Sequence, residues 1–161
     1  MIFVSTGTEK YPFIRLVKTI DEAKGKGLIR DEVVIQDCAI GSKYKITNCT
    51  HYSILPYEEM VRWVRNCNLY ICHAGVGSIV TGLKEEKISV VVPRYAKYHE
   101  HVDNHQLDIT DEFMKRGQIV ACYDGDDIVD RINSYKTYAK NLVPAYNKSS
   151  REFLSFIKSI I

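Results

Sequence analysis

One glycine-containing segment, Cys72-His73-Ala74-Gly75-Val76-Gly77-Ser78, carries the strongest chemical signal in the sequence. It follows an apolar run and opens a stretch with helical spacing, so free N–H groups and the positive end of a helix dipole face whatever binds there. Glycines allow a ligand close to the backbone, and His73 and Ser78 add side-chain donors. These features predict a phosphate or diphosphate site, although the spacing matches neither the dinucleotide fingerprint nor the ATP-binding loop. The alternative is a tight turn that uses glycine only for packing.

A second polar cluster runs from His99 to Gln106 and holds three histidines, two acids and two amides. A metal interpretation would use three of its side chains: His99, His101 and His105. The first two would need extended backbone while the third falls at the start of a helix, and we therefore expect no metal. A polar ligand with hydroxyl groups would instead be read by one carboxylate and two amides: Asp103, Asn104 and Gln106. A solvated loop without a ligand is the remaining alternative.

Alternating strand-like and helix-like segments must position these residues. Short runs rich in Val and Ile predict strands at 2–5, 33–36, 52–55, 69–72, 89–92 and 119–122, with a weak strand at 44–46. Helical spacing and end signals predict helices near 13–27, 58–66, 74–86, 104–116, 126–141 and 149–161. This alternation predicts one α/β domain over residues 1–161, a Rossmann-like parallel sheet with helices on both faces. Ligands of such folds bind at the carboxyl ends of the strands, where both polar clusters fall.

The composition is that of a globular chain. Its 161 residues are 45% hydrophobic and 26% charged, and the net charge is +2. These values exclude a disordered chain and give no electrostatic argument for nucleic acid. No apolar run approaches the roughly 18 residues that a membrane span needs, and no signal-like segment stands at the start, so we expect a cytoplasmic protein. Five cysteines without a CxxC spacing predict buried or half-buried thiols rather than disulfides or a zinc site.

The motifs, taken in order, resemble the C-terminal, donor-binding half of the family 28 glycosyltransferases. The resemblance rests on four segments and extends over nearly the whole chain: His73–Ile79, Val91–Arg94, Glu100-His101 and Asp103–Gln106. It is closest to stand-alone small subunits, such as the exopolysaccharide protein PssE and the small catalytic subunit of the two-part dolichol-pathway GlcNAc transferase. It implies that the chain is one half of a GT-B glycosyltransferase and binds a UDP-sugar.

The resemblance also implies which residues bind the donor. Gly7 and Thr8 would form a first glycine loop, and Pro56 and Tyr57 would lie at the uracil. The residues around the diphosphate would be His73, Gly75, Gly77 and Ser78. Those at the transferred sugar would be Asp103, Asn104 and Gln106. His73 would stabilise the leaving diphosphate, and no metal cofactor is implied. Thr81 stands where many relatives place a glutamate on the ribose, so a single hydroxyl would replace a carboxylate there.

A whole GT-B enzyme needs a second half, which carries the acceptor and the usual catalytic base. In this family the second half can be a separate membrane-anchored subunit that brings a lipid-linked acceptor. The expected function is therefore transfer of galactose or GlcNAc from a UDP-sugar to such an acceptor, in bacterial capsule or exopolysaccharide synthesis, with the chain held at the inner face of the membrane by its partner. A non-catalytic nucleotide-sugar-binding or regulatory subunit is the alternative. The sequence does not choose between the two sugars.

The predicted helix at 149–161 bears on the partner. Its large apolar side chains would share one broad face: Phe153, Leu154, Phe156, Ile157, Ile160 and Ile161. That face could pack on the domain's own sheet or, as the resemblance suggests, on the partner subunit.

Overall fold

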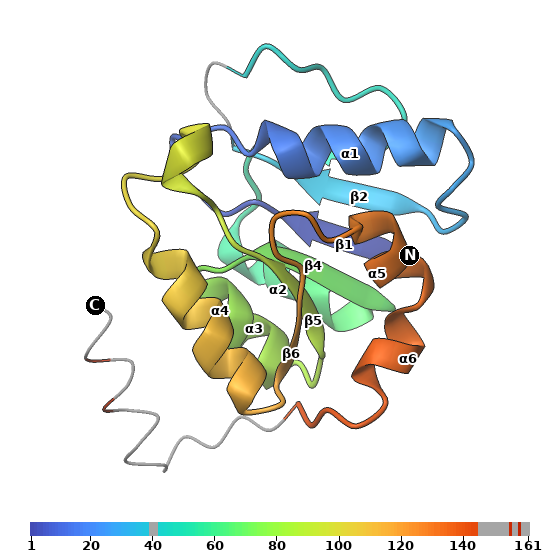
Figure 1. Cartoon of the computed structure of the whole chain (residues 1–161). Coiled ribbons are helices and arrows are strands. Elements are labelled where there is room, and N and C mark those ends of the chain that lie inside the picture. The colour runs from blue at the N-terminus through green and yellow to red at the C-terminus, as the bar shows by residue number, and fades with distance from the viewer. Residues whose placement is uncertain (39–41, 145–154, 156–157, 159–161) are drawn as a thin grey trace.

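The computed structural model describes residues 1–38, 42–144, 155 and 158 (Figure 1). Within them, six strands form one sheet in the order β3-β2-β1-β4-β5-β6, and every neighbouring pair is parallel. The strands are β1 (Ile2–Ser5), β2 (Val33–Gln36), β3 (Thr50–Tyr52), β4 (Leu69–His73), β5 (Ser89–Val92) and β6 (Ile119–Ala121). The predicted Rossmann-like parallel sheet is confirmed.

The strand order creates a switch point between β1 and β4. From β1 the chain builds outward through β2 and β3, then returns to place β4 on the other side of β1. Val4 accordingly lies opposite Ile35 of β2 and Ile71 of β4. The loops after β1 and β4 leave the sheet toward opposite faces, and the crevice between them is where doubly wound folds bind ligands.

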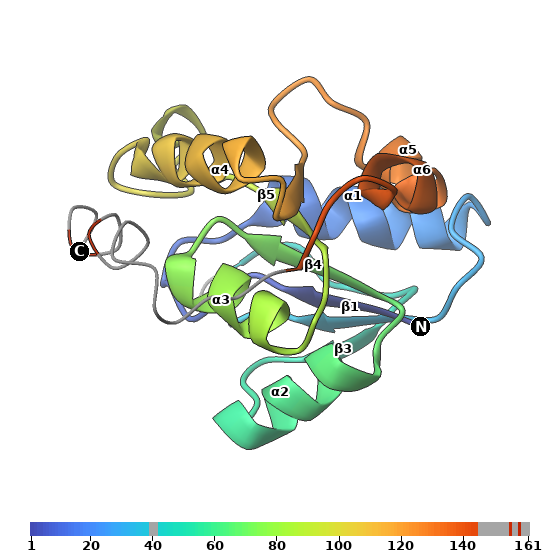
Figure 2. The same ribbon diagram turned by 90° about the horizontal axis from the view of Figure 1, so that it is seen from below.

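Helices cover both faces of the sheet. They are α1 (Ile14–Gly25), α2 (Tyr57–Asn66), α3 (Val76–Lys84), α4 (His105–Lys115), α5 (Ile128–Asn133) and α6 (Tyr135–Ala139), with a 3-10 turn at Ala96–Tyr98. Figure 2 shows α1, α5 and α6 on one side and α2 and α3 on the other. One buried cluster joins Ile20 of α1 to Ile132 of α5, and the other joins Val64 of α2, Ile79 of α3 and Phe113 of α4.

The segment 44–46 is not the weak strand that the sequence predicts. Its neighbourhood is organised by Asp21, a fully buried carboxylate of α1. Asp21 accepts from the Tyr44 hydroxyl (2.8 Å) and from the backbone N–H groups of Thr47 (3.1 Å) and Asn48 (2.7 Å), so this stretch is fixed by one carboxylate rather than by a ladder. Burial raises the pKa of Asp21, but the hydrogen bonds from Asn48, Thr47 and Tyr44 outweigh it and the pKa is lowered.

Other boundaries also differ from the sequence prediction. The third strand ends at Tyr52 rather than starting there. The helix predicted at 126–141 is two helices, because the chain bends at Ser134, whose hydroxyl bonds to the Asp130 carboxylate (3.0 Å) one turn back. The helix predicted at 149–161 lies, except for Ser155 and Lys158, outside the described residues.

The five cysteines all lie in the described part and are free thiols, three buried and two half-buried, as predicted. Within the described ranges, none of the helices has the length and apolarity needed to cross a bilayer.

Candidate functional site

The glycine-containing segment lies at the switch point of the sheet. His73 is the last residue of β4, Gly75 is the N-cap of α3, and the helix starts at Val76. The first N–H groups of a helix have no carbonyl partner within it, and among the described residues no side chain caps this end. The N-terminus of α3 therefore offers backbone donors and the positive end of its dipole to the crevice between β1 and β4.

A cavity of about 490 Å³ opens in front of this helix end. It brings together most of the residues predicted to bind a donor: Gly7, Thr8, Tyr57, His73, Gly75, Gly77, Ser78 and Thr81. Sequence reasoning did not identify several others that line it: Ser5, Glu9, Gln36, Leu55, Met60, Val80 and Lys84. Gln36 could have been found as the last residue of β2, because it ends at the same edge of the sheet, where its amide oxygen accepts from the Ser5 hydroxyl (3.1 Å).

The two glycines of the β4–α3 segment have different roles. A Cβ at Gly75 would stand 2.2 Å from the Nε2 atom of His73, and one at Gly7 would stand 2.4 Å from its Cε1 atom. The imidazole is thus enclosed between two glycine backbones, and Gly75 makes room for this ring while it also lines the cavity. A Cβ at Gly77 would meet nothing within 4 Å, so Gly77 is the glycine that faces open space.

His73 is a neutral side chain in this setting. It is 7% exposed, and burial, with a smaller contribution from the positive charge of Arg94, lowers its pKa to about 3. A neutral imidazole has one N–H to donate and one nitrogen that accepts. Its Nδ1 atom lies 3.5 Å from the Ser78 hydroxyl oxygen, so the two groups stand side by side at the cavity.

Thr81 lines the same cavity one turn further along α3. Its hydroxyl donates to the Gly77 carbonyl oxygen of its own helix (2.8 Å) and keeps acceptor capacity toward the cavity. Glu85, a further turn along, is held by a two-pronged contact with Arg65, with N···O distances of 2.7 and 3.2 Å. Arg65 also lowers the pKa of Glu85. This carboxylate is therefore engaged elsewhere and does not replace the glutamate of relatives.

An apolar wall closes the side of the cavity formed by α2. Pro56 is the N-cap of α2, and Tyr57 is its first residue, 63% exposed. Tyr57 lines the cavity together with Leu55 and Met60, whereas Pro56 is not among the described lining residues. An exposed phenol beside two apolar side chains is a surface on which a planar ring can stack.

The segment from Asp103 to Gln106 is not part of the described cavity lining. Gln106 is 2% exposed, and its amide oxygen accepts from the backbone N–H of Arg94 (3.1 Å). Asn104 accepts from the backbone N–H of Ala96 (3.0 Å). Asp103 contacts two histidine rings, His101 (3.2 Å) and His105, and these contacts, the one with His105 foremost, lower its pKa. Asp103 and Asn104 thus remain at the surface, while Gln106 is used inside the protein.

The three histidines of the metal interpretation do not converge. His99 has left-handed backbone with φ +56°. The side chains that do come together, with their possible ligand atoms within 4.8 Å of one another, are His101, Asp103 and His105. They lie on an irregular loop and the first residue of α4, outside the lining of the candidate site.

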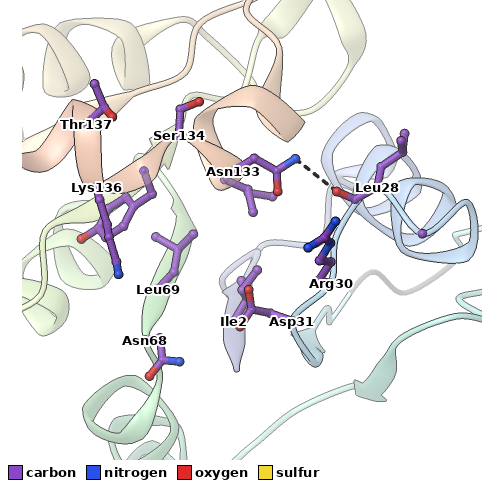
Figure 3. A pocket seen from close by; sticks show the side chains of 13 residues that line it. Ile2, Leu28, Arg30, Asp31, Asn68, Leu69, Asn133, Ser134, Lys136 and Thr137 are labelled. Atoms are coloured by element: carbon purple, nitrogen blue, oxygen red, sulfur yellow. Dashed lines mark hydrogen bonds between the residues drawn. The ribbon is translucent and has the colours of Figure 1, made fainter.

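A larger cavity, about 820 Å³, lies at the opposite edge of the sheet (Figure 3). Its lining includes Ile2 and Leu69, the first residues of β1 and β4, and Ser134 at the α5–α6 bend. Across it the Asn133 amide donates to the Leu28 carbonyl oxygen (3.1 Å). It holds none of the residues predicted to bind a ligand, and burial raises the pKa of Tyr135 in its lining.

Comparisons with known proteins agree on one family. The model of the glycosyltransferase family 28 C-terminal domain matches residues 1–161. The chain is 32% identical over 94 residues to "UDP-N-acetylglucosamine transferase subunit ALG13" of Candida glabrata, a match that spans 58% of this chain and 44% of that protein. The chain thus matches less than half the length of this relative.

Solved structures show the same fold. A solution structure of ALG13 superposes with a TM-score of 0.63 at 19% identity, over 96% of this chain and 93% of that one. The MurG crystal structure from Acinetobacter baumannii superposes with a TM-score of 0.54 at 15% identity, over 98% of this chain but 49% of that one. The fold is therefore that of one half of a GT-B glycosyltransferase.

Proposed function

We propose, since this chain belongs to the glycosyltransferase family 28 C-terminal domains, that it is the donor-binding subunit of a two-part glycosyltransferase. The observation that carries the proposal is the cavity at the switch point, where the α3 N-terminus, His73 and Ser78 face one space. Backbone donors and neutral side-chain donors at such a helix end suit a diphosphate. The donor would be a UDP-sugar, with its nucleoside toward Tyr57.

The predicted residues would contact the donor in the following way, with Gly75 at the start of α3 beside the diphosphate. The diphosphate would lie over Gly77, Ser78 and the first amides of α3, with Gly7 and Thr8 on the other side of the crevice. The uracil would stack at Pro56 and Tyr57, and the ribose would meet Thr81. Asp103 and Asn104 would read the hexose from the neighbouring loop, and the buried Gln106 would support the site without contacting the sugar.

The chemistry would be transfer of the hexose with release of UDP. As the bond between the anomeric carbon and the diphosphate oxygen breaks, negative charge grows on that oxygen. The α3 amides and one N–H of His73 would stabilise this charge by fixed hydrogen bonds. Because His73 is neutral, it would act as a hydrogen-bond donor and not as a cation. The base that deprotonates the acceptor hydroxyl, and the acceptor itself, would belong to the partner.

The partner, the acceptor and the sugar are the finer parts of the proposal. The relative in Candida glabrata is named as a transferase subunit, which favours a second subunit here as well. That subunit would resemble the N-terminal half of a GT-B enzyme, anchor the pair at the inner face of the membrane and bring a lipid-linked sugar. UDP-GlcNAc follows the name of that relative, whereas UDP-galactose follows the exopolysaccharide-like sequence around Glu100, and a capsule or exopolysaccharide is the expected product.

One observation favours a second candidate function. The ribose would lack the carboxylate that many relatives provide, because position 81 holds a threonine. The Thr81 hydroxyl in addition donates its proton to the Gly77 carbonyl and would only accept from the ribose. A weaker donor site of this kind would suit a non-catalytic, nucleotide-sugar-binding or regulatory subunit of the same complex.

The two candidates predict different results in one assay. The chain would be co-expressed with the membrane-anchored subunit and supplied with radiolabelled UDP-GlcNAc or UDP-galactose and a polyprenyl-diphosphate-linked sugar. We expect transfer by the pair, little by the chain alone, and none by a pair that contains Gly77→Leu but still assembles. Normal transfer by the Gly77→Leu pair would place the donor site on the partner and favour the regulatory subunit.

A further inference from the structure

Arg94, the residue two positions after β5, has the largest of the fully buried side chains described. It is 1% exposed, and its guanidinium lies 4.6 Å from the centre of the Phe13 ring. The hydrogen bonds of its two terminal nitrogens all go to backbone carbonyls. One nitrogen donates to Thr6 (2.6 Å), and the other donates to Tyr11 (2.7 Å) and Glu100 (3.1 Å). A single side chain therefore fastens the loop after β1 to the loop after β5.

Arg94 holds the backbone carbonyl of Glu100 but does not pair with its carboxylate. Glu100 is 2% exposed, and its carboxylate accepts from Arg15 (3.0 and 3.1 Å) and from the backbone N–H of Tyr95 (3.1 Å). In addition, the Nε atom of Arg94 is buried without a hydrogen-bond partner among the described residues. A buried cation that contacts no carboxylate and leaves one donor unpaired costs stability compared with an apolar side chain of similar size.

The two terminal nitrogens of the Arg94 guanidinium form a fork, and the position of this fork suggests why a residue that lowers stability is present. The carbonyl that Arg94 holds most closely belongs to Thr6, the residue before Gly7. Gly7 has φ +81°, lines the donor cavity and touches the ring of His73. The hydrogen bond from the Arg94 guanidinium to Thr6 therefore fixes the position of the Gly7 backbone, against which the His73 ring packs.

Gln106 holds the backbone of Arg94, whereas the three carbonyls hold its side chain. Its amide oxygen accepts from the Arg94 backbone N–H, and both groups are buried. This contact ties the first turn of α4 to the end of β5. A continuous series of contacts thus leads from Gln106 through Arg94 and Thr6 to Gly7 and the edge of the cavity.

We propose that Arg94 is a positioning residue for the donor site, acting through the forked shape of its guanidinium rather than through its charge. The proposal rests on the proposed function, because the site that is positioned is the UDP site. Gln106 contributes to the same positioning, because its amide oxygen holds the backbone N–H of Arg94 without contacting the ligand. A lysine at position 94 keeps the charge but has a single nitrogen, which cannot hold carbonyls of both loops in the same way.

The test compares Arg94→Lys with two matched variants in the full chain. Arg131→Lys is the control for loss of a guanidinium, because Arg131 also donates to a carbonyl, that of Ala121 (3.3 Å), and lies over a ring, that of Tyr138 (4.2 Å). Phe13→Leu is the control for loss of stability, because it removes the ring that packs against Arg94 but keeps the guanidinium of Arg94 and its hydrogen-bonding groups. Each variant is titrated with UDP by calorimetry, and its thermal unfolding is followed in parallel.

We expect Arg94→Lys to weaken UDP binding at least about tenfold, while Arg131→Lys binds as the unmodified chain does and Phe13→Leu loses melting temperature without a comparable loss of affinity. Unchanged affinity in Arg94→Lys, or an equal loss in Phe13→Leu at equal stability, would overturn the proposal.

A second readout separates this proposal from the proposed function. Without any ligand, the NMR signals of the Gly7 amide and the His73 ring should move in Arg94→Lys and stay in place in Arg131→Lys. If the unmodified chain binds no UDP, the proposed function fails regardless of these signals. If the signals do not move in Arg94→Lys, the positioning role fails even when UDP binds.

Discussion

The two edges of the sheet each carry a cavity, and the larger one is not the better candidate. The cavity at the amino ends of the strands measures about 820 Å³, and the one at the carboxyl ends about 490 Å³. The smaller one has a glycine-bearing helix start, an enclosed imidazole and a hydroxyl on one side. The larger one lies beside the C-terminal ends of α1, α2 and α5, where carbonyl groups and the negative ends of helix dipoles gather.

The direction of the chain, more than the volume of a cavity, decides where an anion can bind. In a parallel sheet with return helices, the helices of the crossovers begin at the carboxyl edge and end at the amino edge. At the amino edge only the five-residue α6 begins, among the helices described.

The largest effect is expected from Gly77→Leu. Gly77 faces open space, so a leucine fits the folded chain but occupies the place of the diphosphate, and UDP binding should fall by more than about 100-fold. The matched control is Thr137→Leu, which puts the same side chain at the lining of the larger cavity and should leave affinity unchanged. Calorimetry with UDP measures both, and the reverse pattern would exchange the roles of the two edges.

His73→Ala should have the next largest effect. Loss of one fixed donor to the leaving diphosphate should reduce turnover of the assembled enzyme by about 2–4 kcal/mol in barrier height. The control His51→Ala removes an exposed histidine and should leave turnover as it was. A lower melting temperature with undiminished turnover of the folded His73 variant would assign the ring to packing alone.

The enclosed imidazole also predicts a pH dependence of stability. Above pH 6.5 the ring is neutral in both the folded and the unfolded chain, so it adds no slope. Below pH 6.5 the unfolded chain takes up the proton first, because the folded pKa is about 3, and the free energy of unfolding falls. Chemical unfolding of the unmodified chain should therefore lose up to about 1.4 kcal/mol per pH unit more than that of His73→Asn. Parallel curves for the two proteins would mean that the ring is accessible to protons.

The smallest effect should separate the two amides near the candidate sugar site. Asn104→Ala should weaken binding of the UDP-hexose by about 1 kcal/mol, the value of one hydrogen bond, and leave UDP unaffected. Gln106→Ala should weaken UDP and the UDP-hexose equally, since Gln106 acts through Arg94. Competition titrations with both ligands measure this, and a sugar-selective loss in Gln106→Ala would assign that residue to the hexose instead.

The sequence predicted the elements that follow simple periodicity. The runs at β1, β2, β4 and β5 each hold at least three consecutive apolar residues and are buried along their length, so strands could be recognised without tertiary information. The glycine-containing segment was placed correctly at a strand end, because the order of elements fixes the edge of the sheet.

What escaped sequence reasoning depends on contacts between distant residues. Asp21 organises residues 44–48 from another element, and no local pattern announces it. Arg94 has the sequence context of a polar loop residue, yet two of the three carbonyls that its buried guanidinium holds lie more than 80 positions away. Gly75 lines the cavity, but its second neighbour, the ring of His73, becomes evident only when the turn is folded.

The most direct test of the central claim is a titration of the ¹⁵N-labelled full chain with UDP, followed by amide NMR signals. We expect the signals of Gly7, Gly77 and Ser78 to move together with one dissociation constant, while those of Leu28 and Thr137 stay in place. Movement confined to Leu28 and Thr137, or no movement with millimolar UDP, would contradict a donor site at the carboxyl edge of the sheet.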